Sequence, residues 1–303
     1  MLLLRILALI LLLASCSSDR ILSKEEATTE EPSNLKKSPE IFTIKSEADL
    51  PIVTKEGTEI DLNMYYLVLA KDLTEIDFPI RVEVTELRSP AEIILQGMNS
   101  TGRGQLLGTD GHLLVEIYKG KDKVKLSSQG GVMATMTGFK DGHVDIRHKL
   151  YFADGYDELL YWDFTRFEGF CFIGLKDQMV CKEIEITDHL QYQFYPGSLS
   201  WHSVAWDMDL GDVTPFAIKG GSKNTRAYLY FPDLQAIVDL KNEWTTPVPI
   251  RRQAILFAFE RYSEEEYAVH YEELTVQPNT TINLKLEKKN MYEFATYLDK
   301  INP

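Results

Sequence analysis

The chain has 303 residues, of which 32 are Lys or Arg and 46 are Asp or Glu, and its formal net charge is −14 at pH 7. Hydrophobic residues at 44% and charged residues at 26% are ordinary for globular proteins and exclude a wholly disordered chain. A broad nucleic-acid surface needs a surplus of Lys and Arg, so we predict no nucleic-acid partner.

The first sixteen residues have the form of a secretory leader. Arg5 supplies a positive charge, and residues 6–13 form an apolar run far shorter than the roughly 20 residues that span a bilayer. Residues 13–16, Leu-Ala-Ser-Cys, resemble a bacterial lipobox. The resemblance implies removal of a signal peptide, residues 1–15, and lipidation of Cys16. Ser17 then favours the outer membrane, while the alternative is an ordinary signal peptide with a chance cysteine.

The next segment is polar and almost free of apolar side chains. Such a stretch cannot bury a core, so we predict that residues 16–40 are a lipid anchor followed by a disordered tether. Beyond it we expect a β-rich region at 41–205 and a C-terminal β-sandwich with a terminal helix at 206–303.

From about residue 41, hydrophobic side chains recur with a period of two, which is typical of strands. In residues 79–86, for example, Ile80, Val82 and Val84 share one face. Turn residues, among them Asp110-Gly111, separate such runs. Many short strands predict an all-β fold with two β-sandwich-like regions. Further strands are expected at 113–118, 123–127, 133–137, 150–152, 159–164, 226–231, 254–260 and 281–286.

Two short helices interrupt this pattern. Ser89 precedes Pro90, as an N-cap precedes a first-turn proline. Near the C-terminus, Asn290 and Glu293 have the spacing of a capping box. The second helix would carry an apolar face made by Phe294, Leu298 and Ile301.

Residues 263–274 fit either a helix or a strand. We predict a strand because strands flank the segment on both sides. Its inward side chains would be Tyr267, Val269 and Tyr271, with a bulge at Glu272-Glu273.

Cys171 and Cys181 lie at similar distances from a predicted hairpin turn near residues 176–177. They could therefore face each other across two strands. A disulfide is allowed in an oxidising cell envelope, and two free thiols are the alternative.

Two tryptophans, Trp201 and Trp206, flank His202. Exposed aromatic side chains can stack on sugars, which makes this pair a candidate glycan site. Large aromatic residues in a β-sandwich more often fill the core, and we favour that interpretation.

Asp207 and Asp209 occupy alternate positions, and Asp212 follows shortly after. Carboxylates in such an arrangement suit Ca²⁺, which makes these residues a candidate metal site. A plain acidic loop is the favoured alternative.

Motifs of known enzyme classes, including the nucleophile elbow, the zincin helix and phosphate-binding loops, do not occur in the sequence. His143 and Asp145 would share one strand face, which could serve a metal. His148 falls on the opposite face, so a solvated strand edge is the favoured interpretation. We therefore predict no enzyme and no cofactor. A glycan-acting hydrolase would need a pair of acids at a suitable separation; candidates are Asp154, Asp157, Glu183 and Glu185.

Two stretches resemble a group of uncharacterised Bacteroidota envelope lipoproteins. The first spans residues 55–60 and 82–86, the helix at 89–94, and residues 101–108 and 111–116; it is also distantly similar to ZU5-type β-domains. The second spans residues 226–235, 248–250 and 254–258. The resemblance implies a ZU5-like N-terminal β-domain, a C-terminal β-sandwich and an envelope location. Asp110-Gly111 stands where this group often has two glycines.

These observations predict a membrane-anchored envelope lipoprotein with a non-enzymatic role in interaction or assembly. Its partners would be the membrane, through the lipid anchor, and an envelope protein or glycan. The alternatives are a surface carbohydrate-binding lipoprotein and, less favoured, a glycan-acting hydrolase.

Overall fold

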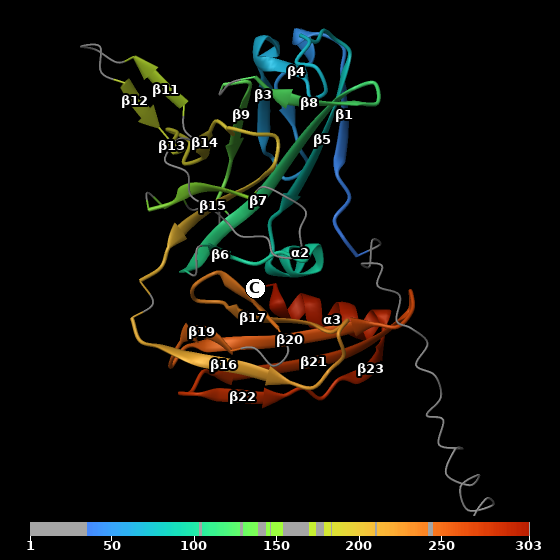
Figure 1. Ribbon diagram of the computed structural model, residues 1–303, viewed down its shortest axis with the longest axis vertical. Helices are drawn as coiled ribbons and strands as arrows, with labels where there is room; N and C mark the ends of the chain where they lie inside the picture. Colours follow the sequence, from blue (N-terminus) through green and yellow to red (C-terminus); the bar gives the residue numbers. More distant parts are fainter. Residues whose placement is uncertain are drawn as a thin grey trace, which may run out of the picture.

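The protein is an all-β molecule in two halves, which lie one above the other in Figure 1. No helix in the described part is both long and apolar enough to cross a membrane. The leader, the lipobox and most of the predicted tether lie outside this part. The computed structural model describes residues 35–102, 105–127, 130–138, 144–145, 147–153, 170–173, 179–182, 184–209, 211–241 and 245–302.

The upper half is a sandwich of two antiparallel sheets. The first has the strand order β1 (Glu40–Ile44), β5 (Ile80–Leu87), β7 (Gln105–Lys119), β15 (Trp201–Asp207) and β10 (Lys149–Ala153). The second has the order β13 (Ile184–Ile186), β14 (Tyr192–Phe194), β9 (Val132–Met136), β3 (Glu59–Leu62) and β2 (Ile52–Val53). Smaller elements complete this half: η1 (Glu47–Asp49), η2 (Met64–Tyr66), β4 (Leu67–Leu69), β6 (Thr101–Gly102) and β8 (Asp122–Leu126).

The predicted alternation fixes the core of this sandwich. Ile80, Val82 and Val84 are at most 2% exposed and pack in one cluster with side chains of the opposite sheet. The Asp110-Gly111 turn prediction is wrong, because β7 runs through these residues for 15 positions without reversing. The strand expected at 159–164 lies outside the described residues.

A separate two-stranded sheet joins β11 (Phe170–Ile173) to β12 (Met179–Lys182), as the predicted hairpin requires. The antiparallel register places Cys171 opposite Cys181 along the backbone.

The lower half is also built on two sheets. One has the order β19 (Thr245–Pro249), β16 (Val213–Lys219) and β22 (Thr280–Asn283), with β22 parallel to β16. The other has the order β18 (Ala236–Leu240), β17 (Arg226–Phe231), β20 (Gln253–Arg261), β21 (Glu266–Thr275) and β23 (Glu287–Asn290). Leu229, Phe231 and Leu256 on the five-stranded sheet pack in one cluster with Phe216 and Ile218 of β16.

The five-stranded sheet is buried on its second face as well. That face carries Tyr228, Tyr230, Phe257 and Phe259, each at most 3% exposed. Burial on both faces explains why β17 and β20 are nearly continuous apolar runs instead of alternating ones. The strand prediction for 263–274 is confirmed by β21. The expected bulge at Glu272-Glu273 is wrong, since β21 pairs with β20 residue by residue.

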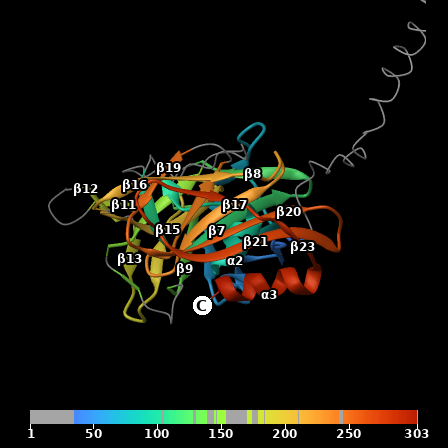
Figure 2. The same ribbon diagram turned by 90° about the horizontal axis from the view of Figure 1, so that it is seen from below.

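Helix α3 (Met291–Ile301) covers part of this second face and lies along β21 and β23 (Figure 2). Asn290 caps it: its side chain accepts the backbone N–H of Glu293, and the Glu293 carboxylate accepts the N–H of Asn290. The predicted capping box is confirmed. Phe294 is fully buried and stacks on Tyr267 with 4.2 Å between ring centroids.

The upper half covers the rest of the face through α2 (Pro90–Gln96) and the loop after it. Ser89 caps α2 as predicted, by accepting the backbone N–H of Glu92 at 3.2 Å. Ser100 then pairs with edge strand β18: its N–H donates to the Ile237 carbonyl at 2.8 Å, and its hydroxyl accepts the Ile237 N–H at 2.6 Å.

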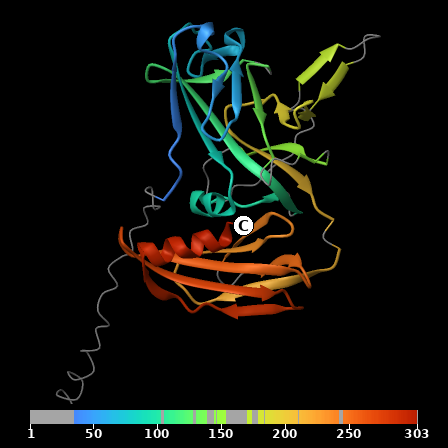
Figure 3. The ribbon, with the colours of Figure 1, turned by 180° about the vertical axis from the view of Figure 1, so that it is seen from behind.

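The two halves therefore share one hydrophobic cluster, which we call the waist core. In Figures 1 and 3, α2 of the upper half lies next to α3 of the lower half. The chain passes from the upper to the lower half between β15, which ends at Asp207, and β16, which begins at Val213. The predicted domain boundary was at 206. The waist core includes Leu87, Ile93, Met98, Leu107 and Trp201 from the upper half, and Tyr230, Ile237, Phe257, Phe294 and Ile301 from the lower half.

Replacing Phe294 with alanine should test the waist core. We expect a loss of about 3–5 kcal/mol in the free energy of unfolding, because a buried ring leaves a cavity. Urea denaturation should still show one transition, since both halves share the core. The matched control is Tyr292→Ala on the same helix, where 87% exposure predicts a change below about 0.5 kcal/mol. Equal effects of the two variants would contradict the packing described here.

Candidate functional site

A β-bulge creates the main polar cluster of the described structure. Two residues of β7, Asp110 and Gly111, stand opposite the single residue Val204 of β15. Gly111 has φ +122°, and a Cβ added there would lie 3.1 Å from the Leu87 carbonyl oxygen. A bulge redirects side chains relative to a regular strand, and here the Asp110 side chain is buried.

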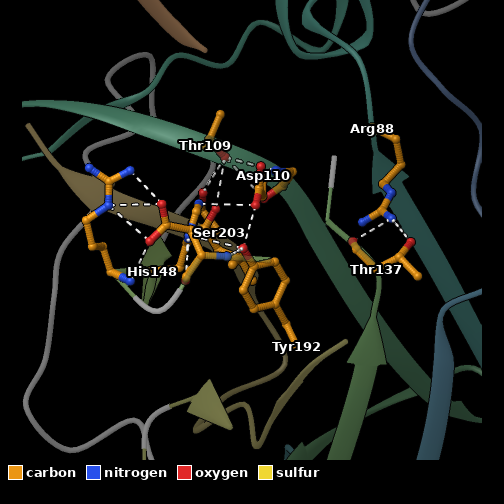
Figure 4. A network of polar contacts seen from close by, with 11 residues as sticks. Arg88, Thr109, Asp110, Thr137, His148, Tyr192 and Ser203 are labelled. Atoms are coloured by element: carbon orange, nitrogen blue, oxygen red, sulfur yellow. Dashed lines mark hydrogen bonds and ion pairs between the residues drawn. The ribbon is translucent and has the colours of Figure 1, made fainter. Parts of the chain in front are cut away.

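Asp110 meets a tyrosine and a histidine in this position (Figure 4). The Tyr192 hydroxyl donates to Asp110 Oδ2 at 2.6 Å, and His148 Nε2 lies 3.2 Å from the same oxygen. Tyr192 comes from β14 on the opposite sheet, so this contact crosses the sandwich. Burial, then the hydrogen bond to Asp110, raises the pKa of Tyr192 far above its ordinary value.

The segment around Asp145 closes the cluster. Its backbone N–H donates to the Tyr192 hydroxyl at 2.7 Å, and its carbonyl lies 2.9 Å from His148 Nδ1. Because a carbonyl oxygen can only accept, this hydrogen bond places a proton on Nδ1. The prediction that His148 lies on a solvated strand edge is wrong, since its side chain is only 3% exposed.

Hydroxyl groups hold the bulge itself. Thr109 Oγ1 accepts the Gly111 N–H at 3.1 Å and lies 3.0 Å from Ser203 Oγ of β15 (Figure 4). A separate pair lies on the neighbouring strand, where Arg88 Nη2 donates to the carbonyl and the hydroxyl of Thr137 at 2.7 and 2.8 Å. Burial lowers the pKa of Arg88.

The composition of the Asp110–His148–Tyr192 cluster would suit acid–base chemistry, which requires a group within hydrogen-bond reach of a substrate. The Asp110 side chain is only 6% exposed, and its carboxylate is occupied by protein partners. The arrangement instead joins the β7 bulge and β14 to Asp145 and His148. Its chemistry is that of a buried polar network in which His148 Nε2 lies near Asp110 without making a hydrogen bond.

Trp206 lies on the outer side of this cluster. Its ring covers Gly108, where an added Cβ would come within 2.1 Å of ring carbon Cζ2. The ring also meets the His148 ring edge-on, with 4.7 Å between the ring centroids. The Arg147 guanidinium carbon lies 5.8 Å from the centroid of the Trp206 ring. Trp206 is thus packed among protein groups, although it stays partly exposed.

Trp201 is the buried member of the candidate glycan pair. Trp201 is 5% exposed and belongs to the waist core, so neither ring face is available to a sugar. This outcome agrees with the favoured core interpretation of the aromatic residues.

Two of the candidate Ca²⁺ ligands, Asp207 and Asp209, make hydrogen bonds within the protein. Asp207 accepts hydrogen bonds from the Tyr151 hydroxyl at 2.6 Å and from Lys149 Nζ at 3.0 Å, whereas Asp209 accepts the Gly211 N–H. Burial alone would raise the pKa of Asp207, but these hydrogen bonds hold it below the ordinary value. Within the described residues, which include Asp212, no three His, Cys, Asp or Glu side chains are grouped so that they could hold a metal.

Several predicted site residues lie outside the described structure. Cys16 is one of them, and so are three of the four candidate hydrolase acids, namely Asp154, Asp157 and Glu183. The Asp110 cluster was not predicted from the sequence, because Asp-Gly is a strong signal for a hairpin turn. In the structure the same dipeptide forms a bulge within a strand.

The chain matches no protein-family model and no curated protein. The resemblance to Bacteroidota envelope lipoproteins therefore stays a prediction from the sequence.

Removing the Asp110 carboxylate should destabilise the upper half. We expect Asp110→Ala to lower the free energy of unfolding by about 1–3 kcal/mol, because it leaves the buried Tyr192 hydroxyl without its acceptor. Tyr192→Phe should cost about 1–3 kcal/mol, since it removes one buried hydrogen-bonding group. Exposed Asp209→Ala is the control and should change stability by less than about 0.5 kcal/mol. If urea unfolding shows the same loss of unfolding free energy for Asp209→Ala as for Asp110→Ala, the network is refuted.

The acid titration of Asp145 should depend on Arg147. Hydrogen bonds from the Arg147 side chain lower the pKa of Asp145 from 3.8 to about 2. A depressed aspartate pKa means that the interaction stabilises the fold above about pH 4 and is lost as the pH falls through 2. Carboxyl ¹³C NMR should therefore show the Asp145 midpoint moving up toward 3.8 in Arg147→Ala. The control Lys149→Ala should leave the Asp145 midpoint unchanged. An unchanged midpoint in Arg147→Ala would contradict the ion pair between Asp145 and Arg147.

The register of Cys171 and Cys181 predicts a disulfide in protein isolated from an oxidising envelope. Intact-mass analysis without reductant should give a mass lower by two hydrogen atoms than after reduction. Alkylation before reduction should modify neither residue. Full alkylation of both cysteines in unreduced protein would establish the alternative of two free thiols.

Proposed function

We propose that this protein is a lipid-anchored envelope protein whose β-rich body acts in interaction or assembly and not in catalysis. The observation that carries the proposal is the waist core, in which two sandwiches share one hydrophobic cluster. A body of this kind offers broad sheet surfaces in a fixed relation to each other. Such surfaces suit the binding of another envelope component.

The sequence supports the location. A short apolar leader, a lipobox ending at Cys16 and a polar tether are the parts that an acylated protein needs to stand off a membrane. The resemblance to Bacteroidota envelope lipoproteins with a ZU5-like domain points the same way. Ser17 after the lipidated cysteine favours the outer membrane.

The groups that sequence analysis offered for ligand chemistry serve packing or local structure instead. Trp201 fills the waist core, and Asp207 accepts hydrogen bonds from Tyr151 and Lys149. These roles favour the interaction proposal over the glycan-binding and hydrolase alternatives.

Two linked experiments test the proposal. In cell fractionation, the full-length protein should sediment with membranes, and Cys16→Ser should release it. Cys171→Ser removes a thiol from the folded part and should leave the protein in the membrane fraction. Sedimentation of Cys16→Ser with membranes would refute the anchor.

The second experiment is affinity isolation of the anchored protein from gently solubilised envelopes. A stoichiometric protein partner that also co-purifies under high salt would support the interaction role. Enrichment of glycan without a protein partner would favour the carbohydrate-binding alternative.

A further inference from the structure

The described chain begins at the waist, beside α3. Leu35 packs against the waist core, and Lys37 Nζ lies 3.1 Å from Glu56 and 2.7 Å from Glu92 of α2. Figures 1 and 3 both show this first segment next to the N-terminal end of α3. The predicted tether is therefore fixed to the body at one side of its middle.

The tether length limits how far that side can stand from the membrane. Cys16 and Leu35 are joined by residues 17–34, which are eighteen residues. Fully extended, they would reach about 60 Å, and as a flexible coil their mean span would be about 20–25 Å. The α3 side of the waist is thus held near the bilayer more closely than the ends of either half.

The surface next to this attachment carries exposed tyrosines and lysines. Tyr292, the second residue of α3, is 87% exposed, and Tyr262 at the end of β20 is 49% exposed. Lys288 Nζ lies 5.7 Å from the Tyr262 ring, and Lys300 Nζ lies 5.1 Å from the Tyr297 ring. We call Tyr262, Lys288, Tyr292, Tyr297 and Lys300 the tyrosine–lysine surface.

Lysines lie among these tyrosines although the chain as a whole has a net charge of −14. Residues 284–302 hold four lysines against three acidic residues, and the adjoining turn at 263–266 adds three glutamates. The lysines supply the local attraction to anionic lipid. Tyrosine places an apolar ring and a polar hydroxyl at the headgroup level, and lysine reaches outward from the same depth.

We propose that the tyrosine–lysine surface rests on the phospholipid headgroups of the membrane that holds Cys16. This inference rests on the proposed lipid anchor and adds an orientation to it. The contact is weak alone, and the tether makes it effective by keeping the surface close to the bilayer. The side of the waist opposite the tyrosine–lysine surface then faces away from the membrane.

The test uses the full-length lipidated protein in liposomes that contain zwitterionic phospholipid, anionic phospholipid and headgroup nitroxide lipid. Tyr292→Trp is compared with Tyr65→Trp, which has a matched exposure of 78%. Tyr65 belongs to η2, between β3 and β4, which lie at the far end of the upper half in Figure 1. After subtraction of the wild-type fluorescence, nitroxide should quench the indole introduced at 292 at least about threefold more than that at 65.

Liposome flotation of the same samples separates the two proposals. Loss of flotation would refute the lipid anchor. Flotation with equal quenching of the two variants, or with stronger quenching at 65, would refute the orientation alone.

A second measurement needs no substitution at the surface. Acetylation of lysines in the wild-type protein should be slowed at Lys288 on liposomes relative to detergent. Lys125 of β8, an exposed lysine of the upper half, should be unaffected. Protection of Lys288 in native envelopes but not on liposomes would assign this surface to a protein partner and overturn the lipid proposal.

Discussion

Burial of the five-stranded lower sheet on both faces is the constraint on which the architecture depends. A sandwich needs only one apolar face per sheet, yet β17 and β20 are apolar on both. The second face, with Phe257 and Phe259, must therefore be covered by something other than β16 and its neighbours. Helix α3 covers part of it, and α2 with the adjoining loop of the upper half covers the rest. The two halves are joined because neither buries its apolar surface alone.

Burial also governs the polar network in the upper half. A bulge places the Asp110 carboxylate inside the sandwich, where a lone charge would be costly. Tyr192 and His148 meet it, and the segment around Asp145 closes over them. The network thus links two sheets through hydrogen bonds, as the waist core links two halves through apolar contact. Both leave the outer surfaces of the body free for other roles.

The sequence predicted the local elements well, whereas the burial of the candidate site residues came only from the structure. Period-two alternation located most strands, and capping chemistry located both helices at Ser89 and Asn290. These signals are local, since they depend on residues two to four apart. The site predictions at Trp201 and Asp209 relied on residue type alone. Whether an aromatic ring is a binding platform or part of a core depends on which elements pack over it, and no local pattern carries that information.

By itself, the sequence determined the fold class, the capped ends of the helices and the hairpin that places Cys171 opposite Cys181. Each of these follows from backbone periodicity and short-range hydrogen bonding. Only the tertiary structure decided that Asp110-Gly111 is a bulge within a strand, that Trp201 is core, and that the two sandwiches share a waist. The physical reason is that a turn and a bulge use the same residues, and burial is a property of contacts between segments distant in the chain.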